Sequence, residues 1–230
     1  FKQKTAYEIP KRDWSSDVCS SDLMHPSGEM IGGVIYNDFY NETIDIGISN
    51  TSQLNKLLQV TNDDLELDFV KQNKVYTKLN IKDSQFNLSY VLADLMIIPK
   101  VASVGEIDFN IVANINQENI NALIKAKNAL PDSENVLITH DSLDGNKIKL
   151  EFGGDIEYAN KISYNINLTE DSDTEFNLDS LYNSGIIKEI LSNNKDMGEG
   201  IIYLNNEGIM KIEFHKENIT SFYYLVAREK

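Results

Sequence analysis

Alternation of apolar and polar residues dominates the chain and predicts β-strands. Leu65, Leu67 and Phe69 alternate with acidic residues. The same alternation continues in further segments, at residues 75–81, 86–90, 107–113, 148–152, 162–168, 212–214 and 222–226. Period-two alternation with β-branched and aromatic residues is typical of antiparallel sheets that have one face in water.

Three segments carry helical spacing instead, at residues 52–60, 118–130 and 180–192. In each of them aliphatic residues recur three or four positions apart, which predicts a helix that lies across a sheet. We expect the first helix to be capped by Thr51 or Ser52, and the third by Asp179 or Ser180. Pro131 should end the second helix, because proline cannot continue the hydrogen-bond ladder.

The same order of elements surrounds each predicted helix. An alternating strand leads into an Asn, Asp or Ser cap, then a short helix, then further strands. The three copies begin at residues 44–48, 107–111 and 175–178. A recurrence of roughly 60–70 residues indicates a duplicated supersecondary unit. We therefore predict an α+β fold of repeated units, with helices on one face of antiparallel sheets.

Residues 1–23 differ in origin from the rest of the sequence. Two stretches, 1–9 and 13–23, resemble the translation of a short-read sequencing adapter. We exclude them from fold reasoning; the alternative is a natural tail rich in Ser and Asp. Cys19 and Trp14 both lie here, so the remainder has no cysteine and no thiol chemistry is expected. We also expect the natural N-terminal sequence to be missing.

Composition and charge limit the classes of function that fit this chain. The 230 residues carry a net charge of −15, with 41% hydrophobic and 25% charged residues, as in a soluble globular protein. No apolar run reaches the ~18–20 residues that span a bilayer. The acidic excess argues against a simple nucleic-acid binder, unless the few cations are gathered on one surface.

Catalytic chemistry is not predicted. The chain has no Walker-type phosphate loop, no Gly-x-Ser-x-Gly and no His-Glu-x-x-His. His25, His140 and His215 are isolated from one another in the sequence. We expect no metal site, no cofactor and no enzymatic activity.

Residues 93–105 fit neither the strand nor the helix pattern. The segment is apolar and contains Pro99. We interpret it as a connector between domains, and a buried edge strand is the alternative.

Four stretches carry a further likeness, at residues 46–58, 62–67, 118–125 and 212–227. Their order and spacing resemble a DNA polymerase sliding clamp, most closely the T-even-phage type, over nearly all of residues 24–230. No single motif is diagnostic. The resemblance implies a clamp fold in which β-α-β-β-β units occur twice per domain.

The resemblance also implies a domain organisation. Residues 24–92 would be a truncated first clamp domain, 93–105 the interdomain connector and 106–230 the second clamp domain. Three helices are predicted where a two-domain protomer has four, and we expect the missing one in the N-terminal unit.

A sliding clamp encircles duplex DNA without reading its sequence and tethers the replicative polymerase for processive synthesis. The implied partners are double-stranded DNA, the DNA polymerase, a separate clamp loader driven by ATP, and two further copies that close a trimeric ring. No membrane partner is implied. The expected setting is the cytoplasm of a host cell infected by a bacteriophage.

Two sets of site residues follow from the resemblance. Polar and basic helix positions, mostly opposite the apolar stripes, would face DNA, namely Lys56, Asn121, Lys125, Lys127, Asn128, Lys188 and Lys195. An apolar pocket for partner peptides would be lined by Leu95, Met96, Ile97, Ile98, Leu225, Val226 and Ala227. The alternatives are ordinary lysines on solvated helices for the first set, and plain core packing for the second.

Two other classes of protein remain open. A β-rich structural or assembly protein of a phage would need no basic helix faces. A carboxylate-metal nuclease would need a convergent cluster of Asp and Glu and would cut DNA.

Overall fold

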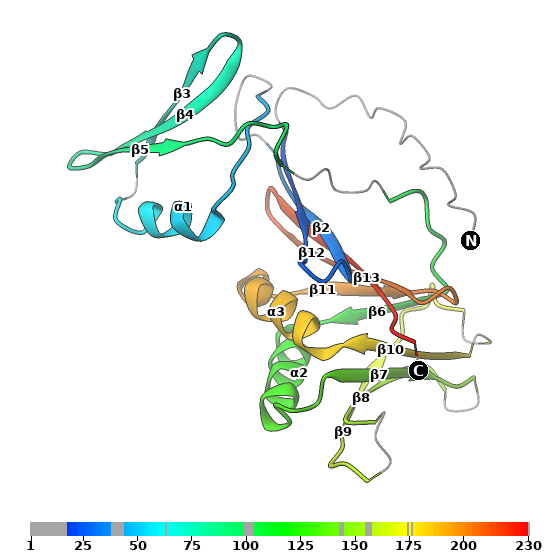
Figure 1. The fold of residues 1–230 in the computed structure, drawn as a ribbon. Helices are drawn as coiled ribbons and strands as arrows, with labels where there is room; N and C mark the ends of the chain where they lie inside the picture. Colours follow the sequence, from blue (N-terminus) through cyan, green and yellow to red (C-terminus); the bar gives the residue numbers. More distant parts are fainter. Residues whose placement is uncertain are drawn as a thin grey trace. The chain divides into compact units, whose positions relative to one another are not determined.

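The computed structural model describes residues 18–37, 44–62, 64–98, 104–142, 145–154, 158–173, 175 and 177–229. They form two compact units (Figure 1). Unit 1 comprises the described parts of Phe1–Asn41 and Val101–Lys230, and unit 2 those of Glu42–Lys100. None of the described helices is long and apolar enough to cross a membrane.

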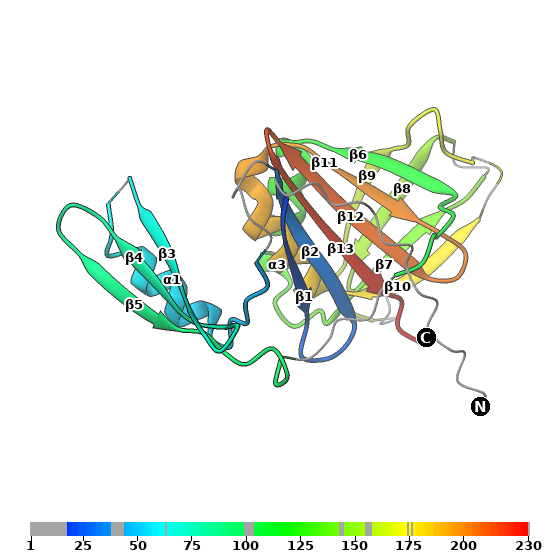
Figure 2. The ribbon, with the colours of Figure 1, turned by 90° about the horizontal axis from the view of Figure 1, so that it is seen from above.

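The larger sheet of unit 1 has six antiparallel strands in the order β1-β2-β13-β12-β11-β6. Figure 2 shows β2, β13 and β12 side by side, although β2 is far from the other two in the sequence. The strands are β1 (Val18–Met24), β2 (Met30–Asn37), β6 (Ile111–Ile115), β11 (Gly200–Leu204), β12 (Ile209–Lys216) and β13 (Ile219–Val226).

The smaller sheet of unit 1 has four antiparallel strands in the order β10-β7-β8-β9. Its strands are β7 (Asn135–His140), β8 (Lys147–Phe152), β9 (Ile162–Asn167) and β10 (Leu178–Asn183). Two helices, α2 (Gln117–Ala129) and α3 (Ser184–Asn194), pack against each other (Figure 1), and the short 3₁₀ turn η1 (Lys195–Met197) follows α3. Both sheets and both helices contribute to one buried apolar cluster.

Unit 2 is much smaller. Its helix α1 (Thr51–Leu58) precedes a three-stranded antiparallel sheet of β3 (Glu66–Gln72), β4 (Val75–Lys82) and β5 (Asn87–Val91), in that order. Among the described residues its buried apolar core consists of four side chains, Leu79, Ile81, Tyr90 and Leu92. No residue of α1 is buried.

The repeated unit predicted from the sequence is present, except that residues 44–48 of the first copy form an isolated bridge at Gly47 and not a strand. Each helix begins after an asparagine whose side chain accepts a hydrogen bond from the first turn: Asn50 before α1, Asn116 before α2 and Asn183 before α3. In each copy the residue two or three positions before this cap forms an isolated antiparallel bridge to a residue just beyond the copy's last strand. These bridges are Gly47 to Ala93, Ala113 to Leu168, and Leu181 to Arg228.

Several element boundaries differ from the sequence prediction. Asn50 caps the first helix in place of Thr51 or Ser52, and the third copy's strand begins at Leu178 rather than at residue 175. The third helix was expected from Ser180, but Ser180 lies in β10, paired with Ile138 of β7, and the helix begins at Ser184. Pairing with β7 therefore overrides the capping tendency of Asp179 and Ser180. The second copy's strand begins at Ile111 rather than at residue 107.

The compact units also differ from the expected domains. The resemblance implied one domain at residues 24–92, whereas the described part of Phe1–Asn41 groups with unit 1. The physical reason is that β2 pairs with β13 from Ile219↔Tyr36 to Leu225↔Met30. Strand β1 contains part of the segment that resembles an adapter and pairs with β2; the rest of that segment, residues 1–17, lies outside the described residues.

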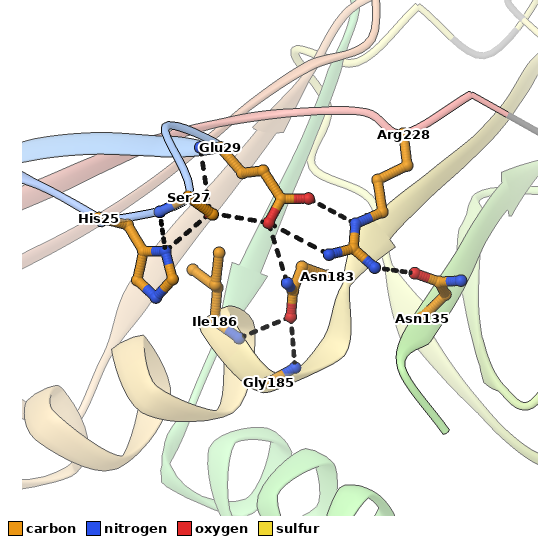
Figure 3. A network of polar contacts seen from close by, with 8 residues as sticks. All are labelled: His25, Ser27, Glu29, Asn135, Asn183, Gly185, Ile186 and Arg228. Carbon is orange, nitrogen blue, oxygen red and sulfur yellow. Dashed lines mark hydrogen bonds and ion pairs between the residues drawn. The ribbon is translucent and has the colours of Figure 1, made fainter. Parts of the chain in front are cut away.

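A polar network fastens the β1–β2 turn to the end of the chain (Figure 3). Glu29 accepts two hydrogen bonds from the Arg228 guanidinium, at 2.5 Å to Nε and 3.1 Å to Nη2. The same carboxylate accepts from Ser27 Oγ and from Asn183 Nδ2, and Arg228 Nη1 donates to Asn135. Arg228 chiefly lowers the pKa of Glu29, from 4.5 to about 2. One ion pair thus joins the hairpin, the N-terminus of α3, the start of β7 and the C-terminal segment.

We expect Glu29→Gln to destabilise unit 1 by about 1–2 kcal/mol at pH 7, because the pair is partly exposed and solvent screens part of its energy. A lowered folded pKa contributes stability above the unfolded pKa of about 4.5 and loses it as pH falls toward about 2. Urea unfolding at pH 7 and at pH 2.5 should therefore show a large difference between the two proteins at pH 7 and a small one at pH 2.5. The control is Glu199→Gln, at an exposed glutamate; equal effects of the two substitutions would contradict the assignment.

Candidate functional site

Helix α2 carries the clearest polar face. Asn121, Lys125 and Asn128 are exposed, whereas Ile120 and Leu123 on the opposite side are buried. The face predicted from the sequence is thus open to solvent on a helix held firmly by its apolar side. Asn116 and Asn119 fix its start through a reciprocal capping box.

Lys127 has a different position from the other predicted lysines. It is half-buried, and its ammonium donates hydrogen bonds to the carbonyl oxygens of Leu130, at 3.4 Å, and Pro131, at 2.8 Å. These carbonyls follow the C-terminal end of α2, where a cation also interacts favourably with the helix dipole. Its observed contacts are therefore structural.

Helix α3 continues directly into η1, as its predicted basic face requires. Lys188 is half-buried on α3, and Lys195 is exposed at the start of η1. Helices α2 and α3 pack against each other in unit 1 (Figure 1), and Lys125 lies on the first and Lys188 on the second. In unit 2, Lys56 is exposed in the last turn of α1 and is that helix's one charged residue.

The helix lysines are not neutralised by carboxylates. Within the described residues, Lys56, Lys125, Lys188 and Lys195 have no Asp or Glu oxygen within 4.0 Å, whereas strand lysines such as Lys82, Lys149 and Lys211 form ion pairs. Helix α2 holds two lysines and one glutamate, and α3 holds one of each. The helices are therefore free of the acidic excess that gives the whole chain its charge of −15.

Unit 2 presents an apolar surface at the start of the predicted connector. Met96 is 89% exposed and Ile97 70%, with Leu95 also exposed and Ile98 half-buried. Ile97 borders a hollow of about 400 Å³ whose wall includes Leu57 of α1 and Tyr90 of β5. Large aliphatic side chains with this exposure are unusual on a surface that binds nothing.

The C-terminal residues of the predicted pocket belong to unit 1 and divide into two kinds. Leu225 is 1% exposed and is part of the core, so it cannot touch a partner. Val226 is 57% exposed and Ala227 is half-buried, so both can be reached. Alternation along β13 predicts this division, since neighbouring residues of a strand point to opposite faces.

Two of the three repeats end in a strand that lies at the edge of its sheet. Strand β13 already has β2 on its outer edge, whereas β5 and β9, the last strands of the other two copies, each lie at the end of a sheet. Val91 on β5 is 68% exposed. A hydrophobic residue at an unpaired strand end was the available signal.

The histidines lie in separate environments. His25 contacts Ser27, His140 contacts the Lys147 carbonyl, and His215 contacts Glu213 and Thr220. Among the described residues, no three His, Cys, Asp or Glu side chains gather into a group that could hold a metal ion.

Comparison with known proteins gives the fold class. No family model and no curated protein matches the sequence. The structure resembles proliferating cellular nuclear antigen (PCNA) from Entamoeba histolytica, with a TM-score of 0.67 and 15% identity over 94% of this chain and 91% of that chain. It also resembles A. fulgidus PCNA, solved with the C-terminal region of FEN-1, with a TM-score of 0.70 and 16% identity over 92% of this chain and 85% of that chain.

A third similar structure is the PCNA2–PCNA3 complex from Sulfolobus tokodaii, with a TM-score of 0.65 and 10% identity over 92% of this chain and 90% of that chain. At such identities the likeness shows the fold alone. The chain has the sliding-clamp fold, which confirms the predicted α+β class with its antiparallel sheets and few helices. The T-even-phage subtype stays a prediction.

Neighbouring lysines of α2 should behave differently when neutralised. We expect Lys127→Met to lower the free energy of unfolding by about 0.5–1 kcal/mol, because it removes the cation at the helix end. Lys125→Met should change it by less than about 0.5 kcal/mol, as for an exposed surface residue. Urea unfolding of both variants measures the difference, and a larger loss for Lys125→Met would contradict the assignment of Lys127 as the structural lysine.

Proposed function

We propose that this protein is a sliding clamp, a non-enzymatic ring that encircles duplex DNA and tethers a polymerase for processive synthesis. The observation that carries the proposal is a set of helix lysines that, within the described residues, have no carboxylate partner on an otherwise acidic chain; Lys56, Lys125 and Lys195 are exposed and Lys188 is half-buried. A clamp fold supports it, since the solved neighbours with this fold are PCNA proteins.

The charge distribution suits a ring that slides. Duplex DNA carries about one negative charge per 1.7 Å of its axis. A few flexible lysines attract it without fixing a register, because they contact phosphates and do not read bases. The acidic remainder of the chain repels DNA elsewhere. Lys56, Lys125, Lys188 and Lys195 are the cations that we assign to the inner surface, together with the amides of Asn121 and Asn128.

We base ring closure on β5 and β9, which each lie at the edge of a sheet. Pairing of β5 in one copy with β9 of the next would repeat the β13–β2 pairing that exists within unit 1. Such head-to-tail contacts form a closed ring when a whole number of equal rotations between neighbouring subunits adds up to 360°. We propose three copies per ring.

The apolar surface around Met96 and Ile97 is the proposed site for partner peptides, with Val226 and Ala227 as accessible C-terminal candidates. Flexible methionine side chains adapt to varied ligands. The proposed partners are a replicative DNA polymerase and a separate clamp loader, which would supply the ATP-driven opening. We place the protein in a bacteriophage replication system, acting in the host cytoplasm.

We expect Lys125→Glu to weaken binding to a 30-base-pair duplex roughly 3–10-fold at 50 mM salt, irrespective of DNA sequence. The slope of log affinity against log salt should also become shallower by about one phosphate contact. Fluorescence anisotropy measures both quantities.

The matched control for this experiment is Lys147→Glu, the same charge change at an exposed lysine of β8. Equal loss of affinity in the two variants would show that only net charge matters and would count against a DNA-facing α2. Unchanged folding of both proteins is checked by circular dichroism.

We expect Met96→Lys to shorten the products of primer extension by the partner polymerase while leaving DNA affinity within about twofold of the parent protein. A side chain that is 89% exposed contributes little to folding, so stability should change by less than about 0.5 kcal/mol. Val75→Lys, at a 47% exposed valine of β4, serves as the control. Full-length products with Met96→Lys would contradict the assignment of this surface as the peptide site.

A further inference from the structure

A buried asparagine interrupts the apolar stripe of α3. Ile187, Ile190 and Leu191 form this stripe and are at most 3% exposed. The next position of the stripe, seven residues after Ile187, is Asn194, which is 4% exposed. An aliphatic side chain would pack at this position without the cost of burying an amide. The amide at this position therefore indicates a role other than filling the core.

Hydrogen bonds within unit 1 occupy the buried amide of Asn194. Its Nδ2 donates to the carbonyl oxygen of Ile190, at 2.8 Å, and to the Tyr223 hydroxyl, at 3.0 Å. Its Oδ1 accepts from the Ser221 hydroxyl at 2.7 Å. Ser221 and Tyr223 are buried residues of β13. Because both hydrogens of the amide have partners, this network fixes the end of α3 relative to β13.

The turn that follows α3 is also held by contacts of its own. Turn η1 begins at Lys195, directly after Asn194. The Nζ of Lys216, in β12, donates to the carbonyl oxygen of Asp196 at 2.9 Å. Met197 packs against the core of unit 1, and η1 contacts α2, α3 and β12. These contacts fix the backbone that carries Lys195, whereas the residue itself is exposed to solvent.

We propose that Asn194 is a positioning residue for DNA binding, which fixes η1 so that the Lys195 ammonium is held where it contacts a DNA phosphate. This inference rests on the proposed sliding-clamp function. Asn194 is buried and does not touch DNA, so it acts through Lys195. A backbone that is ordered before DNA arrives loses less entropy on binding. The lysine side chain itself stays flexible, so its contact does not select a register.

A double-mutant cycle on the full chain tests the proposal, with fluorescence anisotropy on a 30-base-pair duplex at 50 mM salt. In the parent protein, Lys195→Ala should weaken binding roughly threefold and make the salt dependence shallower by about one phosphate contact. In an Asn194→Leu background, the same substitution should weaken binding by less than about 1.5-fold, because Lys195 is no longer held in place. An undiminished loss in the Asn194→Leu background would overturn the proposal.

Ser221→Ala and Ser184→Ala form a matched pair that keeps the test decisive even where Asn194→Leu folds poorly. Each removes one buried hydroxyl: Ser221 bonds to Asn194, whereas Ser184, at the start of α3, bonds to the carbonyl oxygen of Ser133. Ser221→Ala should reduce the effect of Lys195→Ala on affinity, and Ser184→Ala should leave that effect unchanged. Equal results in the two backgrounds would show a general loss of stability and would overturn the positioning role.

Lys125→Glu separates this inference from the proposed function. Lys125 lies on α2, outside the network, so this substitution should weaken DNA binding equally in the parent and in the Asn194→Leu background. A loss with Lys125→Glu but none with Lys195→Ala in the parent protein would overturn the positioning role and leave the clamp function standing. No loss with either substitution would overturn both.

Discussion

The constraint on which this structure depends is that one β-α-β-β-β repeat cannot bury its own helix. A helix lying on a three-stranded sheet covers one side of its apolar stripe and leaves the other side open. In unit 1 the second repeat supplies the missing cover, so Ile120 and Ile187 are both nearly inaccessible. In unit 2, with one described repeat, the equivalent Leu54 is only half-buried. Among the described residues, unit 2 accordingly has the smaller buried core.

The same constraint gives the helices of unit 1 a buried apolar side and an exposed polar side. Their apolar stripes are fixed by packing, which turns the remaining positions outward in a defined direction. Lys125 and Asn121 are exposed because Leu123 is buried. A rigid helix with a few solvated cations is well suited to a weak, sliding contact with phosphates, since attraction without directional hydrogen bonds does not select a register. Strand lysines such as Lys211 are already engaged with carboxylates and are less suited to this role.

Local patterns predicted much of the fold, and contacts distant in sequence account for the misses. Helical spacing located all three helices and alternation most strands, because these signals depend on neighbours within one turn or one strand. The predicted caps were wrong, since Asn50 and Asn183 cap the first and third helices. Ser180 was misplaced because its partner is Ile138, which lies more than forty residues earlier. The grouping of β2 with β13 was missed for the same reason. At the candidate site, helix spacing predicted the exposure of Lys125, whereas the capping role of Lys127 depends on how the chain turns after α2.

The fastening of the β1–β2 hairpin to β13 has a consequence for synthesis on the ribosome. Strand β2 is among the first described segments to emerge, yet its neighbour in the sheet, β13, is among the last. Unit 2 lies between them and contains its own sheet, so it can form while translation continues. The β1–β2 hairpin therefore keeps an unpaired edge until β13 has been synthesised and Arg228 can bind Glu29. Such long-range closure slows folding and exposes a strand edge to other nascent chains.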